Sequence, residues 1–216
     1  MGTSEIRTTL LRGLLCTRLK SPFSLCFAMF ISFILFSCGN DKWEVDPNSV
    51  KFDTSFSTLN FIEDIQDLPD NDSLALKTLQ QKYGAFWEDY SEDILKIGAA
   101  KKISTINELR RFVSHPDTDE TLKAIDTTSG DKAYLKAVEK TLKDGFKRFH
   151  AFMPEETIPT IIWMPSGFNY AIYPRKEYVA VGVEWFLGPD HHIIGLLPPD
   201  RFPQYQQLRM HPDLMA

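Results

Sequence analysis

The sequence predicts an α+β fold in which amphipathic helices pack on a small antiparallel β-meander. Two observations predict this class. Between residues 73 and 153, apolar residues recur every three or four positions, which is the period of a helix with one buried face. Between Pro159 and Val183, three short apolar runs are separated by turns that contain Pro or Gly, which is typical of strands with tight connections. The 216-residue chain is long enough to bury one sizeable core.

The first 37 residues have the layout of a lipoprotein signal peptide. Basic residues precede an uncharged run of fifteen residues, 23–37. This run is shorter than the roughly 20 apolar residues that a membrane-spanning helix needs, and it has the length of a signal-peptide hydrophobic region. Ser37 then places a small residue directly before Cys38. We therefore expect cleavage before Cys38 and lipidation of that residue. An uncleaved anchor or a buried core helix is the alternative.

Lipidation would attach the mature chain to a membrane without a transmembrane helix, because several acyl chains together anchor stably. Gly39, where an Asp would favour retention in the inner membrane, favours an outer-membrane position facing the periplasm. The acidic residues Asp41, Glu44 and Asp46 follow closely, and in some bacteria such a stretch is a signal for surface display. Both orientations remain open from the sequence.

Composition excludes two classes of function for the body. The net charge is −5, and the segment before Cys38 is basic, so the remainder is more acidic than the whole chain. Nucleic-acid binding needs clustered Lys and Arg, so we expect no nucleic-acid partner. Cys16, Cys26 and Cys38 are the three cysteines of the chain. A body that begins at Cys38 would therefore hold neither a disulfide nor a thiolate metal site.

Residues 38–50 are polar and are predicted to form a tether, which leaves 51–216 as one domain. We expect a brief strand over 50–53. A helix begins near Ser73 after capping residues and continues to Ile97, with a break at Gly84 as an alternative. Further helices are predicted from Ser104 to Val113 and between the 129–131 break and Met153.

The predicted strands are Thr160–Met164, Phe168–Tyr173 and Tyr178–Val183. Ala180 and Gly182 make one face of the third strand shallow, so a helix or a ligand should pack closely there. Beyond Gly188 the chain is rich in turns, and His211-Pro212 has the pattern of a helix start four residues before the last residue. We therefore expect a chain truncated at its C-terminus, with part of the meander uncovered.

No complete catalytic motif or cofactor motif is present, so the sequence assigns no catalytic, cofactor-binding or metal-binding residue. The segment Asp190-His191-His192 is the one local cluster that suggests a metal, but adjacent side chains on an extended segment point apart. Ser166 is interpreted as a turn residue because no base is near it in sequence. Glu184 follows the third strand and is expected to face a cleft, although one carboxylate cannot make an acid–base pair.

Several blocks resemble the gliding motility lipoprotein B (GldB) family of Bacteroidetes: 82–87, 94–98, 166–170 and 181–188, together with Cys38. The resemblance runs from about residue 50 to 216. It implies a lipid-anchored, non-enzymatic component of the cell envelope that gliding requires, with partners in the gliding and type IX secretion apparatus.

The resemblance also implies a layout similar to zinc-dependent peptidases, in which a meander leads into a helix with H-E-x-x-H. The matching helix would begin near His211 and is absent from this sequence, so no active-site residue is carried over. A metallopeptidase-like domain, active or decayed, with its metal-binding helix beyond residue 216 is therefore the alternative function. A ligand-binding lipoprotein that uses the Ala180/Gly182 face is a third interpretation.

Overall fold

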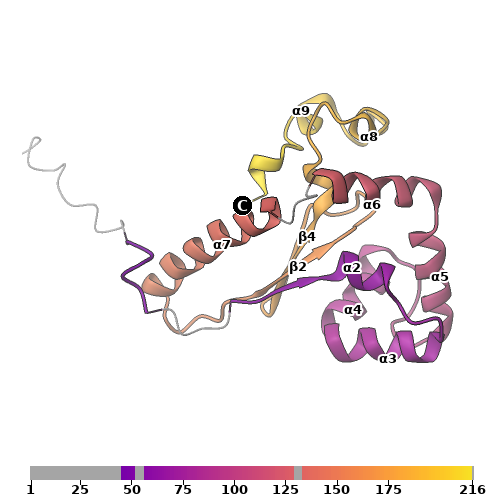
Figure 1. The fold of residues 1–216 in the computed structure, drawn as a ribbon, viewed down its shortest axis with the longest axis horizontal. Helices are drawn as coiled ribbons and strands as arrows, with labels where there is room; N and C mark the ends of the chain where they lie inside the picture. The colour runs from indigo at the N-terminus through magenta and orange to yellow at the C-terminus, as the bar shows by residue number, and fades with distance from the viewer. Residues whose placement is uncertain (1–44, 52–55, 129–132, 216) are drawn as a thin grey trace, which may run out of the picture. The chain divides into compact units, whose positions relative to one another are not determined.

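A computed structural model describes residues 45–51, 56–128 and 133–215. Residues 45–216 form one compact unit, in which helices and a four-stranded sheet confirm the predicted α+β class (Figure 1). The strands are β1 (Thr58–Asn60), β2 (Thr160–Met164), β3 (Ile172–Pro174) and β4 (Tyr178–Gly182), in the order β1-β2-β4-β3. The predicted signal peptide and Cys38 lie outside the described residues, as do residues 52 and 53 of the strand expected over 50–53.

The meander prediction is wrong in strand order. β2 pairs with β4 in parallel, with Ile161 opposite Val179, and β1 pairs with β2 in parallel. The expected antiparallel pairing holds only between β3 and β4, where Tyr173 lies opposite Ala180. β3 therefore lies at the edge of the sheet instead of between its two sequence neighbours.

Burial and Pro174 explain this order. β2 and β4 are apolar on both faces, as strands at the centre of a parallel arrangement are. β3 is short and largely exposed, and it ends in Pro174, which has no N–H to donate to a ladder. Such a strand is tolerated at an edge, where one side of its backbone needs no partner strand. The predicted strand 168–173 is reduced to its end, since residues 165–171 form a loop.

Among the described residues, seven helical segments precede β2. They are α2 (Phe61–Gln66), α3 (Asp72–Tyr83), α4 (Ala85–Asp89), the π-helix η1 (Tyr90–Ile94), α5 (Ile103–Val113), α6 (Pro116–Thr128) and α7 (Ala133–Phe152). The predicted long helix is broken at Gly84, whose φ of +51° is a left-handed conformation that glycine adopts without strain. The break that the sequence left open is therefore confirmed.

The helices predicted at 104–113 and before Met153 are confirmed as α5 and α7, whereas α6 was missed. Pro116 follows the predicted end of the preceding helix, and in the structure it is the first residue of the next one. Proline suits that position because its missing N–H would have no partner within the helix. After β4 come short segments only: the 3₁₀-helices η2 (Val183–Phe186) and η3 (Pro212–Leu214), and the helices α8 (His192–Gly195) and α9 (Gln204–Gln207).

The two faces of the sheet carry separate apolar clusters. On one face, Ile162, Met164 and Ala180 pack with α2–α5, and on the other Ile161, Trp163 and Val181 pack with α6, α7 and the segment after β4. These six side chains are at most 5% exposed. The expectation that part of the meander is uncovered is therefore wrong for β2 and β4, because Met210 and Met215 are buried in the apolar cluster on one of their faces. β3 is the strand that remains largely exposed.

Protein atoms fill the shallow side of β4. Ala180 is buried among the aromatic residues of α3 and α4. A Cβ on Gly182 would lie 2.3 Å from the carbonyl oxygen of Tyr170, so at this end of β4 a loop packs against the strand rather than a helix. This leaves no room for a ligand on the Ala180/Gly182 face.

Candidate functional site

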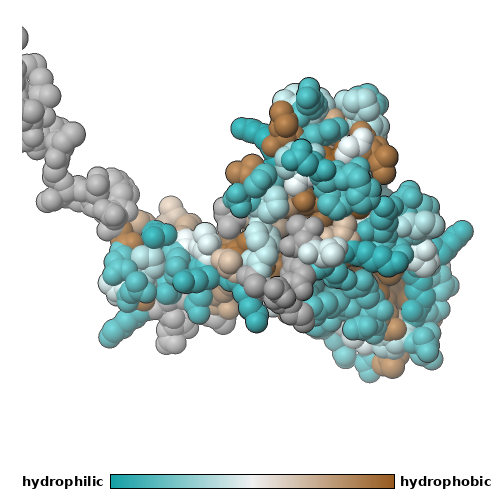
Figure 2. Space-filling view, turned by 45° about the horizontal axis from the view of Figure 1, so that its top comes forward, coloured by the Kyte–Doolittle hydropathy of each residue, from teal (hydrophilic) through white to brown (hydrophobic). Residues whose placement is uncertain are grey.

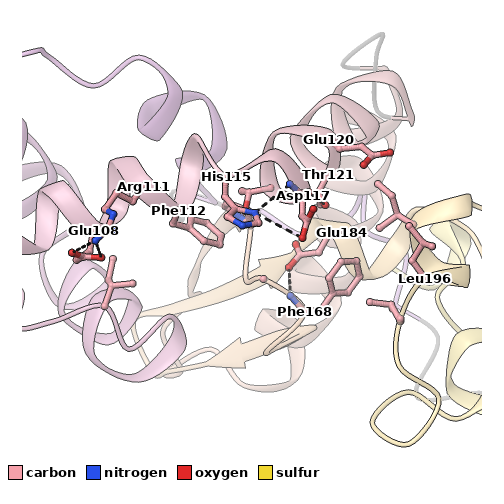
Figure 3. Close-up of a pocket in the computed structure, with 16 residues that line it drawn as sticks. Glu108, Arg111, Phe112, His115, Asp117, Glu120, Thr121, Phe168, Glu184 and Leu196 are labelled. Carbon is pink, nitrogen blue, oxygen red and sulfur yellow. Dashed lines mark hydrogen bonds and ion pairs between the residues drawn. The ribbon is translucent and has the colours of Figure 1, made fainter.

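A pocket of about 650 Å³ lies where α5, α6, α8 and the loop 165–171 meet (Figure 3). Its walls are mixed. Apolar side chains come from the loop, from the end of α5 and from the α8 segment, and charged side chains come from α5 and α6. Glu184, at the start of η2, is part of the lining. This volume lies within the range of pockets that hold small molecules.

Glu184 holds the loop 165–171 in place through hydrogen bonds. Its Oε1 accepts three hydrogen bonds: from the backbone N–H of Ser166 at 2.7 Å, from the Ser166 hydroxyl at 2.5 Å and from the backbone N–H of Phe168 at 3.1 Å. Ser166 Oγ also accepts a hydrogen bond from the N–H of Tyr170 at 3.2 Å. One buried carboxylate and one hydroxyl thus accept four hydrogen bonds from donors of the loop.

The same loop contains two residues with left-handed backbone conformation. Gly167 has φ +62° and Phe168 has φ +57°. A positive φ is uncommon for a residue with a bulky side chain and costs free energy, so the surroundings must stabilise it. The Glu184 hydrogen bond to the Phe168 N–H does so, and the Phe168 ring packs against Trp185 and Phe202, with centroids 6.2 and 6.1 Å away.

Three further hydrogen bonds tie the loop to distant parts of the chain. Tyr90 donates its hydroxyl proton to the carbonyl oxygen of Pro165 at 2.8 Å. Asn169 donates to the carbonyl oxygen of Ile94, in the π-helix, at 3.1 Å. Arg201 donates to the Asn169 side-chain oxygen at 2.8 Å. The loop is therefore a fixed wall of the pocket.

Glu184 itself is completely buried, with no exposed surface. Burial raises the pKa of its carboxyl above the ordinary value of 4.5, and the hydrogen bonds from Ser166 and Phe168 oppose that rise. The other carboxylate oxygen, Oε2, is buried and has no hydrogen-bond partner among the described residues. In Figure 3 the carboxylate extends from η2 toward the side of the pocket formed by α6.

The charged side chains around the rim are paired with one another. Arg111 donates to Glu108 at 3.1 Å. His115 Nδ1 lies 3.8 Å from the Asp117 carboxylate. Glu120 lies 2.6 Å from Nε2 of His192. Such exposed pairs contribute little to stability. The two imidazoles carry charge only when protonated, so Arg111 is the one permanent cation of the described lining, against the carboxylates of Glu108, Asp117, Glu120 and Glu184.

The two adjacent histidines do not converge on one point with a third ligand. Their rings lie 4.6 Å apart, His192 pairs with Glu120, and the His191 side chain caps α8 by accepting from the Ile193 N–H. Burial and the neighbouring His192 lower the pKa of His191. Over 45–51, 56–128 and 133–215, no group of three His, Cys, Asp or Glu side chains is arranged to hold a metal ion.

The structure brings together two residues that the sequence considered separately. Ser166 stands in a turn, as predicted. Its hydroxyl donates to the Glu184 carboxylate, a pairing that the sequence does not predict. Glu184 does line a pocket, as predicted, with its carboxyl group buried in the wall instead of exposed in a cleft. Both residues stand in blocks that carry the family resemblance, which was the one signal that could have linked them.

A family model described as "Gliding motility protein GldB" matches residues 40–216, which is more than half of the chain and includes the whole pocket. This chain belongs to the GldB family. The resemblance seen in the sequence blocks is thereby confirmed, and family membership connects this GldB protein with gliding motility. No curated protein and no solved structure matches the chain.

The lipoprotein character of the GldB family associates the chain with the cell envelope. The match begins two residues after Cys38, so it does not reach the proposed lipidation site. Within the part of the chain that the structure describes, no helix is both long enough and apolar enough to cross a membrane.

Proposed function

We propose that this GldB protein is a lipid-anchored, non-enzymatic component of the gliding apparatus. In this proposal Cys38 carries the lipid, the outer membrane holds the protein facing the periplasm, and its partners belong to the gliding and type IX secretion machinery. The family match over residues 40–216, directly after a lipoprotein-type signal, carries the proposal.

The role of Ser166 supports binding rather than catalysis. A nucleophilic serine must reach a substrate and pass its proton to a base. Ser166 is completely buried, its hydroxyl donates to Glu184, and it accepts from the Tyr170 N–H. The hydroxyl and the carboxylate therefore act together to shape a pocket wall.

The link to type IX secretion rests on the family resemblance alone. The peptidase-like alternative also rests on that resemblance, and no feature of the described residues favours it. A protease assay on the purified protein separates the two functions. We expect no cleavage of unfolded casein; cleavage that a zinc chelator stops would contradict a non-enzymatic role.

Complementation of a strain that lacks the gene tests the anchor. Cys38→Ala should leave colonies unable to spread and should move the protein out of the membrane fraction. Cys26→Ala is the matched control, because Cys26 lies in the hydrophobic run that cleavage would remove; it should restore spreading. If the Cys38→Ala protein stays with membranes after a salt wash and supports gliding, the lipid-anchor proposal is wrong.

A further inference from the structure

The Oε2 atom of Glu184 is the one oxygen of this carboxylate for which the fold supplies no donor. Oε1 is used three times, whereas Oε2 is buried without a partner among the described residues. An unpaired buried polar atom is costly, and a buried carboxylate without a neighbouring positive charge is more so. A ligand that donates to Oε2 would remove this cost.

The pocket beside this oxygen fits an apolar stem. Its lining includes side chains from four separate segments: Ile97, Phe112, Phe168, Ile193, Leu196 and Leu197. The apolar surface continues outward, since Leu196 is 75% exposed and Figure 2 shows brown side chains among teal ones around the C-terminal segments. A ligand with hydrocarbon next to its polar end would therefore bury that hydrocarbon on entering.

The charge of the pocket determines which polar group a ligand should carry. Arg111 is bonded to Glu108 at the rim, so no cation of the described lining is bonded to Glu184. A positively charged donor would give the buried carboxylate its missing counter-charge. The guanidinium of arginine prefers two acceptor oxygens at once, whereas an ammonium group is a compact charge that can bind one oxygen through one of its three N–H donors. Because Oε1 is already occupied, a primary ammonium fits better.

We propose that the pocket binds a primary ammonium group on an apolar stem, with the nitrogen donating to Oε2 of Glu184. The stem lies along Phe112, Phe168 and Leu196. A lysine side chain of a partner protein and a free alkylamine share this chemistry. The proposal rests on the proposed function in one respect: it gives the binding component of the gliding apparatus a ligand class.

Calorimetric titration of the full-length protein with acetyl-Leu-Lys-Leu-amide tests the proposal. Its matched ligand control has norleucine in place of lysine, which keeps the stem and removes the charge. We expect the lysine peptide to bind at least about tenfold more tightly, which corresponds to one retained charged contact. A peptide with arginine in the same place should bind more weakly than the lysine peptide. Equal affinity for the lysine and norleucine peptides would overturn the proposal.

The Glu184→Gln variant tests whether Glu184 is the residue that binds the ammonium group. The glutamine keeps a carbonyl oxygen for the three loop donors and puts a donor where Oε2 stands, so binding of the lysine peptide should weaken at least about tenfold. Glu155→Gln, at an exposed position outside the pocket lining, is the matched control and should change the affinity less than about threefold. Unchanged binding by a folded Glu184→Gln protein would refute the assignment.

A second measurement on the unmutated protein covers the case in which Glu184→Gln fails to fold. n-Butylamine should raise the melting temperature more than n-butanol at equal concentration; equal shifts would contradict the proposal. The affinities of the protein for the lysine peptide and for n-butylamine distinguish the two sources of the ammonium group. Tighter binding of the peptide indicates a lysine side chain of a partner protein, and equal binding indicates a free amine. The outcome of these binding experiments does not affect the Cys38→Ala experiment. The proposal of an ammonium-binding pocket and the proposal of a lipid anchor can therefore be refuted independently.

Discussion

Ser166 and Glu184 stand 18 residues apart in the sequence, and both donors of Ser166, its N–H and its hydroxyl, bond to the same oxygen of Glu184. This pair holds the loop between β2 and β3 in place. It also fixes one wall of the pocket and leaves the second oxygen of Glu184 without a partner in the described part of the chain.

Removing the Glu184 carboxylate should destabilise the whole domain. Glu184→Ala would leave three buried or half-buried donors without an acceptor, and we expect the free energy of unfolding to fall by about 3 kcal/mol or more. Glu184→Gln keeps an acceptor and should lose less than half of that. Urea unfolding of both variants measures the difference. Equal stability of Glu184→Ala and the unmutated protein would show that the pair does not hold the loop.

The raised pKa of Glu184 predicts a pH dependence of stability. Because the folded state holds this proton more tightly than the unfolded chain, stability from this group is fully present below the ordinary pKa of 4.5. It is lost as the pH rises through the higher pKa of the folded state. The stability of Glu184→Gln relative to the unmutated protein should therefore increase with pH across this window. Urea midpoints at a series of pH values check it, and a difference that is constant or decreases would contradict the buried-carboxyl assignment.

Gly182 should not tolerate a side chain. A Cβ there would meet the Tyr170 carbonyl oxygen at 2.3 Å and Ser166 Oγ at 2.9 Å, and the first of these belongs to backbone that cannot rotate away. We expect Gly182→Ala to cost about 2 kcal/mol or more by displacing the loop, as overpacked sites do.

Gly145→Ala is the matched control for that substitution. Gly145 lies within α7, and nothing stands within 4 Å of the position that an added Cβ would take. The same change should therefore stabilise the protein, by up to about 1 kcal/mol, because alanine is the better helix former. Thermal melting of the two variants compares them, and similar shifts in both would mean that the loop does not press on β4.

The proposed lipidation of Cys38 would limit how far the domain can lie from the membrane. Val45 is seven residues after Cys38, and seven extended residues span at most about 25 Å. The Val45 carbonyl oxygen accepts a hydrogen bond from Arg148 near the end of α7, at 3.3 Å. The end of α7 should therefore stay close to the lipid surface.

Fluorescent labels quenched by spin-labelled lipid measure this proximity. A label on Met153→Cys, which is exposed directly after α7 and leaves the Arg148 hydrogen bond intact, should be quenched in vesicles more than one on Lys77→Cys, since α3 packs on the opposite face of the sheet from α7. Both added cysteines would be unique thiols in a mature chain whose Cys38 is blocked by lipid. Equal quenching of the two labels would contradict the proposed tether.

The helices could be predicted because their stabilising pattern is local. The apolar period of α5 and α7 appears within a single stretch of sequence, and the Gly84 break follows from one residue's conformational freedom. α6 was missed because Pro116 can end one helix or begin the next, and the choice depends on how the two helices pack.

The order of the strands and the site itself depend on distant contacts. The short turns suggest that strands adjacent in sequence also pair in the sheet. Instead, the largely buried strands β2 and β4 pair with each other, and β3, whose Pro174 has no N–H to donate, lies at the edge. Glu184 could be recognised as a polar residue after a strand, whereas its pairing with Ser166 depends on the path of a seven-residue loop. No periodicity in the sequence records that path.

Mass spectrometry of the intact protein, extracted from membranes of its host with detergent, tests the lipid anchor most directly. Lipidation at Cys38 predicts a chain that begins at Cys38 and carries a diacylglyceryl group, and fragmentation should place the added mass on that first residue. A chain that keeps residues before Cys38, or one that begins there without lipid, would contradict the proposed anchor.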